Sequence, residues 1–157
     1  AYETTKKTPI SNTDIHWQIE PVSLPIAPHL NEKDLVSKLK STDPKGYVSF
    51  ADQLAWLQRV HSGHKIDIGC LHIGDIRLLS MPGELFVEYQ LAAKSMRPDL
   101  HVMMAAYGDY GPAYIGTTVA YAEGGYETQS TSSNVAPETE PILMQAMKKL
   151  LTSDPKK

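Results

Sequence analysis

The sequence predicts an α/β fold in which helices flank a mixed β-sheet. An apolar segment over 76–81 is followed by a helical pattern and then by a second apolar segment over 101–106. This strand–helix–strand order places the two strands parallel to each other. A further apolar segment over 65–73 precedes them across Gly74-Asp75, a turn that predicts an antiparallel hairpin. One parallel and one antiparallel pair make the sheet mixed.

The N-terminal third is predicted to contain one strand and two helices. Loose alternation of apolar residues from Ile15 to Ile26 predicts a strand that prolines interrupt. Asn31 is a candidate N-cap for a helix over 32–40, because its side chain can accept a hydrogen bond from a free backbone N–H. A loop is expected over 41–46, and Ser49 is a candidate N-cap for the second helix.

Three helices are predicted in the C-terminal half. The first starts at Glu84, directly after Pro82-Gly83, and ends near Met96 before a proline. A short helix is expected over 118–123. The last helix opens at Pro137, where the missing N–H of proline costs nothing, and it carries apolar residues along one side.

Composition and charge exclude several classes of protein. A length of 157 residues fits one domain, with residues 1–13 as a poorly ordered polar segment and residues 153–157 as a solvated tail. The net charge of -3 and the pI near 6.1 provide no positive field for nucleic acid. No apolar run approaches the ~18 residues of a transmembrane segment. The chain starts at Ala1 rather than Met, so the loss of an export signal stays open.

Cysteine and histidine give weak signals. The single Cys70 excludes a disulfide within the chain and lies in an apolar strand, where a buried and inert thiol is expected. His61 and His64 have a spacing that can place both on one helical face, but they lie where the helix is ending. A metal-binding pair and an ordinary interaction with the helix dipole are both open interpretations.

Two features of the C-terminal half point to a site. Glu84 is expected just beyond a buried strand, at the end of the sheet where α/β proteins gather functional groups. Glu84 also has an ordinary interpretation, as a carboxylate in the first turn of a helix that the helix dipole stabilises by roughly 0.3–1 kcal/mol. Five of the eight tyrosines lie between Tyr107 and Tyr126 on glycine-rich backbone. Such phenols can bind a substrate, donate to an oxyanion or ligate a metal, and they can equally pack their rings over the sheet.

Three motifs stand out in this half of the chain: Pro82-Gly83-Glu84, Tyr114-Ile-x-Thr-Thr and Tyr126-Glu127. Together they resemble the C-terminal half of the catalytic domain of the neutral/alkaline (non-lysosomal) ceramidases. The resemblance extends over roughly residues 14–152 and implies that the chain is a fragment of a larger α/β catalytic domain. Asp109 departs from the family, which has asparagine at that position.

The resemblance implies a zinc-dependent amidase that cleaves the N-acyl bond of ceramide. In that family two His, one Glu and one Tyr hold the zinc, and Glu84 and Tyr114 fall on the Glu and Tyr ligands. Tyr126 falls on a catalytic tyrosine that faces the substrate carbonyl. Both His ligands belong to the N-terminal half of the catalytic domain, which would be a partner of this chain. The family also suggests a secreted or periplasmic location.

Two hypotheses of function follow from these patterns. The first is the C-terminal portion of a zinc-dependent amidohydrolase that acts on an N-acyl lipid such as ceramide. The second is a non-catalytic binding or assembly module that uses the same scaffold without metal. A His-x-His motif upstream of this chain would favour the enzyme.

Overall fold

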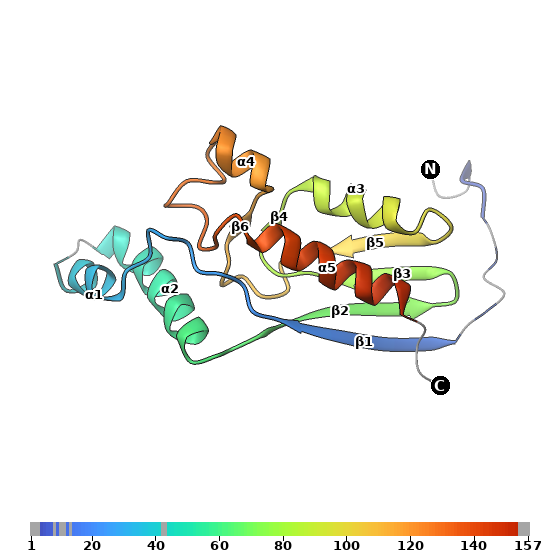
Figure 1. Cartoon of the computed structure of the whole chain (residues 1–157), viewed down its shortest axis with the longest axis horizontal. Helices are drawn as coiled ribbons and strands as arrows, with labels where there is room; N and C mark the ends of the chain where they lie inside the picture. Colours follow the sequence, from blue (N-terminus) through green and yellow to red (C-terminus); the bar gives the residue numbers. More distant parts are fainter. Residues whose placement is uncertain (1–3, 8, 10–11, 13, 42–43, 154–157) are drawn as a thin grey trace.

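A mixed four-stranded sheet, in the spatial order β1-β2-β3-β5, forms the centre of the fold (Figure 1). The pairs β1–β2 and β2–β3 are antiparallel, whereas β3 and β5 are parallel. The structure therefore confirms the predicted α/β class, the hairpin over Gly74-Asp75 and the parallel strand pair. The four strands are β1 (Ile15–Val22), β2 (Ile66–Ile73), β3 (Ile76–Ser80) and β5 (His101–Ala105).

This computed structural model describes residues 4–7, 9, 12, 14–41 and 44–153, without the side chains of residues 44–46. The expectations for the polar segment 1–13 and for the tail 153–157 concern residues that lie largely outside this part. Within the described ranges, none of the helices has the length and apolar character needed to cross a lipid bilayer.

Two helices, α3 (Val87–Met96) and α5 (Thr139–Thr152), cover one face of the sheet and pack against each other (Figure 1). Alternate strand residues point toward them, because successive side chains of a strand face opposite sides. Each fully buried aliphatic side chain of this layer contributes about 1.5–3 kcal/mol. The core between sheet and helices includes Ile68, Cys70, Leu79, Val102, Tyr89, Ala93, Leu143, Met147 and Leu151.

The helices α1 (Glu32–Ser41) and α2 (Pro44–His61) pack against each other beside the end of the sheet (Figure 1). The predicted cap of α1 is confirmed, because the Asp34 backbone N–H donates to Asn31 Oδ1 at 3.2 Å. The loop predicted over 41–46 is wrong at Ser41, which ends α1, and at residues 44–46, which already belong to α2; residues 42–43 lie outside the described part. The predicted cap at Ser49 is wrong, since α2 begins at Pro44. Proline is tolerated in a first helical turn, where its missing N–H has no partner to lose.

The helix predicted from Glu84 begins three residues later, at Val87. Glu84 and Leu85 instead form the short strand β4, which pairs in parallel with β6 (Tyr114–Ile115). The Glu84 N–H donates to the Ala113 carbonyl at 2.8 Å and thus fixes the backbone as a strand. The prediction of Glu84 in a first helical turn is wrong, and the stabilisation by a helix dipole does not apply to it.

The remaining helices begin close to the predicted positions. The short helix α4 (Thr118–Glu123) has the predicted bounds, and Thr117 Oγ1 caps it by accepting from the Ala120 N–H at 3.1 Å. The last helix, α5, begins at Thr139 rather than at Pro137, because Pro137 and Glu138 form a turn before it. This difference is within the usual uncertainty of a helix boundary.

Gly83 connects β3 to the small β4–β6 pair through a turn that requires glycine. Its φ is 57°, and a Cβ atom at this position would lie 2.5 Å from the Ala113 carbonyl oxygen. Its N–H donates to the Asp109 carbonyl at 2.7 Å, and its own carbonyl accepts from the Tyr107 N–H at 2.8 Å. The turn therefore holds the tyrosine-rich loop directly beside Glu84.

A charged pair joins α2 to the same loop. Arg59 donates to both carboxylate oxygens of Asp109, at 3.2 Å and 2.6 Å, and the Gly111 N–H donates to Asp109 Oδ1 at 3.0 Å. The hydrogen bond from Arg59, followed by the bond from Gly111, lowers the pKa of Asp109 below its ordinary value. The side chain of Arg59 is 40% exposed, so solvent screening limits the stability that the pair contributes.

Replacing Gly83 with alanine is expected to destabilise the protein more than replacing Gly63, which serves as a matched control. Both glycines have positive φ, but a Cβ at Gly63 meets no atom within 4 Å. The backbone conformation alone costs about 1–2 kcal/mol in each variant. Gly83→Ala adds a clash with a backbone carbonyl. Urea unfolding measures both losses, and equal losses would show that the Gly83 turn is not sterically constrained.

The Arg59–Asp109 pair is expected to stabilise the fold by about 1 kcal/mol at neutral pH, measured as the coupling energy of Arg59→Met and Asp109→Asn. Because the folded-state pKa of Asp109 is lowered, this stability is present above the unfolded-state value of ~3.9 and is lost as the pH falls through the folded-state pKa. A coupling energy that persists unchanged near pH ~2, below the unfolded-state value, would contradict this assignment.

Candidate active site

Glu84 and Tyr114 lie directly beside each other. They are register partners in the parallel β4–β6 pair, just beyond the carboxyl end of β3. A second backbone bond, from the Phe86 N–H to the Ile115 carbonyl at 3.1 Å, completes the pair. On its other side, the Tyr114 N–H donates to the Ser132 carbonyl at 3.1 Å. The backbone therefore fixes the two side chains at the same end of the sheet, as their positions after parallel strands predicted.

A third side chain, Tyr107, joins this pair. A hydrogen bond to the Glu84 carboxylate is the main cause that raises the pKa of Tyr107. The pKa of Tyr114 is raised as well, first by desolvation and then by the negative charge of Glu84 and a hydrogen bond to it. The negative charge of Glu84 therefore acts on both phenols. A bound cation would act in the opposite direction and favour the phenolate.

The rings of the tyrosine-rich loop form two contacting pairs. Tyr126 meets Tyr114 edge to face, with ring centroids 6.0 Å apart, and Tyr107 stacks on Tyr110 at 6.1 Å. Both separations fall in the range of favourable aromatic contacts. The ring of Tyr126 remains largely exposed, so its hydroxyl is free to meet a ligand. The structure therefore brings all three predicted site residues into one continuous group.

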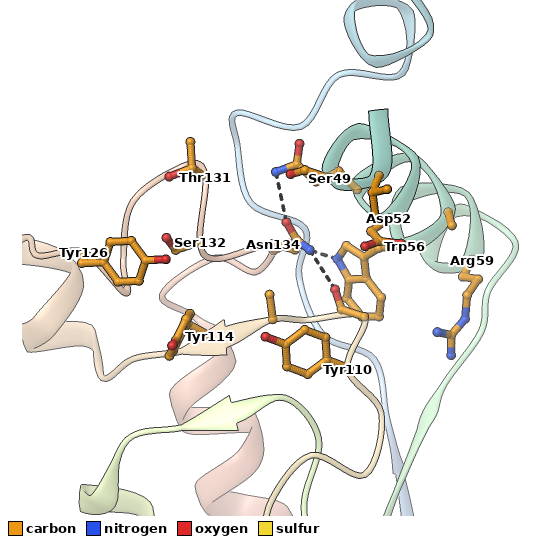
Figure 2. Close-up of a pocket in the computed structure, with 15 residues that line it drawn as sticks. Ser49, Asp52, Trp56, Arg59, Tyr110, Tyr114, Tyr126, Thr131, Ser132 and Asn134 are labelled. Carbon is orange, nitrogen blue, oxygen red and sulfur yellow. Dashed lines mark hydrogen bonds between the residues drawn. The ribbon is translucent and has the colours of Figure 1, made fainter. Parts of the chain in front are cut away.

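An open cavity of about 640 Å³ lies next to this group (Figure 2). Helix α2 forms one wall with Asp52, Trp56 and Arg59, and the opposite side carries Tyr114 and Tyr126 (Figure 2). The volume is in the range of small-molecule sites, which typically combine aromatic walls with a few polar groups. Glu84 is not among the residues that line the cavity.

Asn134 holds the wall of the cavity together. Its Oδ1 accepts from Gln53 Nε2 at 3.3 Å, and its Nδ2 donates to the Gly111 carbonyl at 2.9 Å (Figure 2). The indole N–H of Trp56 donates to the Asn134 carbonyl at 3.0 Å. The polar groups joined by these bonds are largely buried, so each of them has the hydrogen-bond partner that a buried polar group needs.

The donor set tests whether the site fits a zinc ion. Glu84 and Tyr114 supply two oxygen ligands, and catalytic zinc sites have three protein ligands and often include imidazole. Among the residues that the structure describes, no group of three or more His, Cys, Asp or Glu side chains could hold a metal. These two oxygen ligands alone would make an incomplete zinc site, and a zinc ion bound to them would need further ligands.

The histidine and cysteine expectations have separate outcomes. His61 and His64 line different cavities, and His64 accepts from Arg59 at 2.6 Å and lies 3.9 Å from Asp109. The two histidines are thus not brought together as a metal pair.

Cys70 is fully buried, and burial raises its pKa to about 11, whereas the nearby charge of Arg77 acts to lower it. A thiol with that pKa stays protonated at neutral pH, as the sequence predicted.

Sequence reasoning missed the α2 wall of the cavity and the role of Tyr107. Trp56 has the spacing of an ordinary core residue of an amphipathic helix, and Asn134 lies in a polar loop. Neither residue has a local pattern that indicates a cavity. Tyr107 has φ of 65°, which is rare outside glycine. The Tyr107 N–H donates to the Gly83 carbonyl, which holds this residue close to Glu84. Its place in the tyrosine-rich stretch indicated a site, but not that Glu84 would be its partner.

Comparisons with known proteins gave matches among solved structures. A scan of protein-family models and a search of curated proteins gave no match. A ceramidase structure, complexed with C2, aligns with 55% of this chain and 14% of its own at 24% identity, with a TM-score of 0.47.

A longer alignment comes from the neutral ceramidase of Pseudomonas aeruginosa. It covers 92% of this chain at 17% identity, with a TM-score of 0.56. The same alignment covers 29% of the ceramidase chain, so this chain spans less than a third of that enzyme. At this identity the match concerns fold alone: the chain has the fold of a segment of the neutral ceramidase.

Proposed function

We propose that the chain is the C-terminal portion of a ceramidase-like, zinc-dependent amidohydrolase that cleaves an N-acyl amide bond such as that of ceramide. The observation that carries the proposal is the pairing of Glu84 with Tyr114 on neighbouring parallel strands of a ceramidase-like fold. These are the two positions at which the motifs resemble zinc ligands. Their convergence from distant parts of the sequence supports a shared role.

In this proposal Glu84 and Tyr114 hold the zinc together with two His ligands from the N-terminal half of the catalytic domain. When bound, zinc lowers the pKa of a coordinated water to ~7 and polarises the amide carbonyl. Tyr107 orients the Glu84 carboxylate through its hydrogen bond. Such a partner fixes the orientation of a ligand and tunes its charge.

Tyr126 acts on the substrate. Its exposed hydroxyl, beside Tyr114 at the rim of the cavity, donates a hydrogen bond to the carbonyl oxygen as negative charge develops there. The cavity next to it combines Trp56 and three tyrosines with Asp52, Gln53 and Asn134. A surface with both aromatic and polar groups suits an amphiphilic N-acyl substrate.

The second hypothesis, a binding or assembly module without metal, has one observation in its favour. The open cavity of about 640 Å³ is lined by Tyr114 and Tyr126 but not by Glu84, so it could take a ligand without a metal ion at the Glu84–Tyr114 pair. Zinc occupancy of the complete protein separates the two hypotheses.

The isolated chain is expected to bind zinc only weakly, because two oxygen ligands without imidazole make a poor zinc site. Calorimetric titration with zinc measures this directly. Glu88→Gln, a neighbouring exposed carboxylate, serves as the control for Glu84→Gln. A sub-micromolar site in the isolated chain that Glu84→Gln abolishes and Glu88→Gln leaves intact would show that this chain alone supplies enough ligands.

In the complete enzyme, Tyr126→Phe is expected to lower kcat by ~10²–10³ with little change in KM, because the hydroxyl acts mainly in the transition state. Zinc content, measured in the same samples, should stay unchanged. Tyr47→Phe, at an exposed tyrosine outside the cavity lining, is the matched control. Normal turnover of Tyr126→Phe with zinc bound would leave Tyr126 as a packing residue.

Glu84→Gln in the complete enzyme is expected to lower zinc occupancy and hydrolysis together, because the variant loses an anionic ligand. Glu88→Gln should retain both. The measurement is metal analysis after gel filtration, with hydrolysis of an N-acyl amide as the second readout. Full zinc occupancy in Glu84→Gln would refute the ligand role of Glu84.

A further inference from the structure

One histidine, His72, lies inside the layer between the sheet and the helices. It is 2% exposed, and it occupies a helix-facing position of β2 in line with the buried Ile68 and Cys70. Among the residues that the structure describes, neither ring nitrogen of His72 has a hydrogen-bond partner. Buried polar groups nearly always have such a partner, so the environment of this imidazole requires a physical explanation.

His72 lies between two basic residues in the register of the sheet. His16 of β1 pairs with it on one side, and Arg77 of β3 pairs with it on the other. Directly opposite residues of neighbouring strands share a face and contact each other. The row then ends at an apolar residue, Val102 of β5. A proton on His72 would therefore place a positive charge beside Arg77, within an otherwise apolar layer.

The guanidinium of Arg77 is held at the hairpin turn. Its Nη1 donates to the Gly74 and Ile76 carbonyls, at 2.6 Å and 2.9 Å. Arginine stays protonated in proteins, so this positive charge is permanent. Burial, followed by the charges of Arg77 and His16, lowers the pKa of His72 to about 4.

Two carboxylates at this end of the layer already have basic partners. Asp99 accepts from Arg97 at 2.9 Å and 2.7 Å, and Glu20 pairs with Lys149 of α5. Neither carboxylate is among the causes that set the pKa of His72. The charged and titratable groups on the elements around His72 are His16 and Glu20 on β1, Arg77 on β3, Lys148 and Lys149 on α5, Arg97 and Asp99 after α3, and the exposed Asp14 and Asp75 at the hairpin.

The C-terminal end of α5 closes this end of the layer (Figure 1). Ser153 Oγ donates to Gln18 of β1 at 2.8 Å, and Gln18 is the next helix-facing residue after His16. Arg97 donates to the Leu151 carbonyl at 2.6 Å. The end of a helix attracts a cation, but Arg97 already takes that position. The last turn of α5 is thus fastened both to β1 and to the end of α3.

We propose that His72 is an acid-sensitive lock between the sheet and the C-terminal end of α5. With a neutral imidazole, the layer is closed. Protonation places a charge next to Arg77 in a buried row, and water can solvate this charge only when the last turn of α5 lifts from the sheet. His72 lies near the β2–β3 hairpin, whereas Glu84 follows the other end of β3. The lock therefore works whether or not the chain binds zinc.

The lowered pKa of His72 sets the direction and the range of the pH dependence. An unfolded histidine titrates near ~6.5, whereas His72 in the closed layer titrates at about 4. Between these values, opening takes up a proton. The stability is fully present above ~6.5 and falls as the pH is lowered toward the folded-state pKa. From pH ~7 to pH ~5, this linkage favours the open or unfolded form by about tenfold or more.

Urea unfolding of this chain at pH ~7 and pH ~5 measures the effect. Between these conditions, the unfolding equilibrium constant of the wild type should rise about tenfold more than that of His72→Phe, whose ring does not titrate. His101→Phe, at an exposed histidine of β5 in the same sheet, is the matched control and should behave as the wild type does. The same pH dependence in the wild type and His72→Phe would overturn the proposal.

Hydrogen exchange locates the opening. The backbone amides of residues 149–152, in the last turn of α5, should lose about tenfold in protection from pH ~7 to pH ~5 in the wild type, but not in His72→Phe. Low urea concentrations should change this exchange little, because a local opening exposes little surface. Equal protection at both pH values, or exchange only through global unfolding, would overturn the lock at α5.

The wild-type protein provides a reading that does not depend on the folding of any variant. In an NMR titration, the imidazole of His72, assigned through its sequence neighbours, should stay neutral at pH ~5. A folded-state titration of His72 near the ordinary value of ~6.5 would overturn the proposal, even if His72→Phe does not fold.

Discussion

The parallel pairing of β4 with β6 is the constraint on which the candidate site depends. Each of these strands has two residues, and their register places Glu84 opposite Tyr114. Gly83 permits the pairing, because any side chain at its position would meet the Ala113 carbonyl. A backbone fixed by hydrogen bonds on both sides orients side chains more precisely than a free loop does.

Stability and function are divided between two parts of the fold. The layer of α3 and α5 on the sheet buries the apolar core, and the tyrosine-rich loop beyond the strand ends carries the candidate chemistry. Helix α2 connects the two, since Arg59 holds Asp109 and Trp56 donates to Asn134. Functional groups on loops that a rigid scaffold positions are common in enzymes, and the cavity lies where these segments meet.

Elements with regular local patterns were predicted from the sequence. Elements that depend on a partner far along the chain were not. The parallel strands and the bounds of α4 were predicted from local patterns, whereas the cap of α4 at Thr117 was not predicted. Glu84 was placed in a helix because a two-residue strand has no periodicity, and its partner Tyr114 lies far along the chain. The cavity wall at Trp56 could not be predicted, because an apolar helix residue has the same pattern whether it faces a core or a cavity.

The proposed function depends most on Glu84 and Tyr114 holding the same metal ion. Anomalous diffraction at the zinc absorption edge, from crystals of the complete protein, tests it most directly. The expected result is one zinc peak within ~2.2 Å of both a Glu84 carboxylate oxygen and the Tyr114 phenol oxygen. A zinc peak elsewhere, or zinc held without either of these oxygens, would contradict the claim.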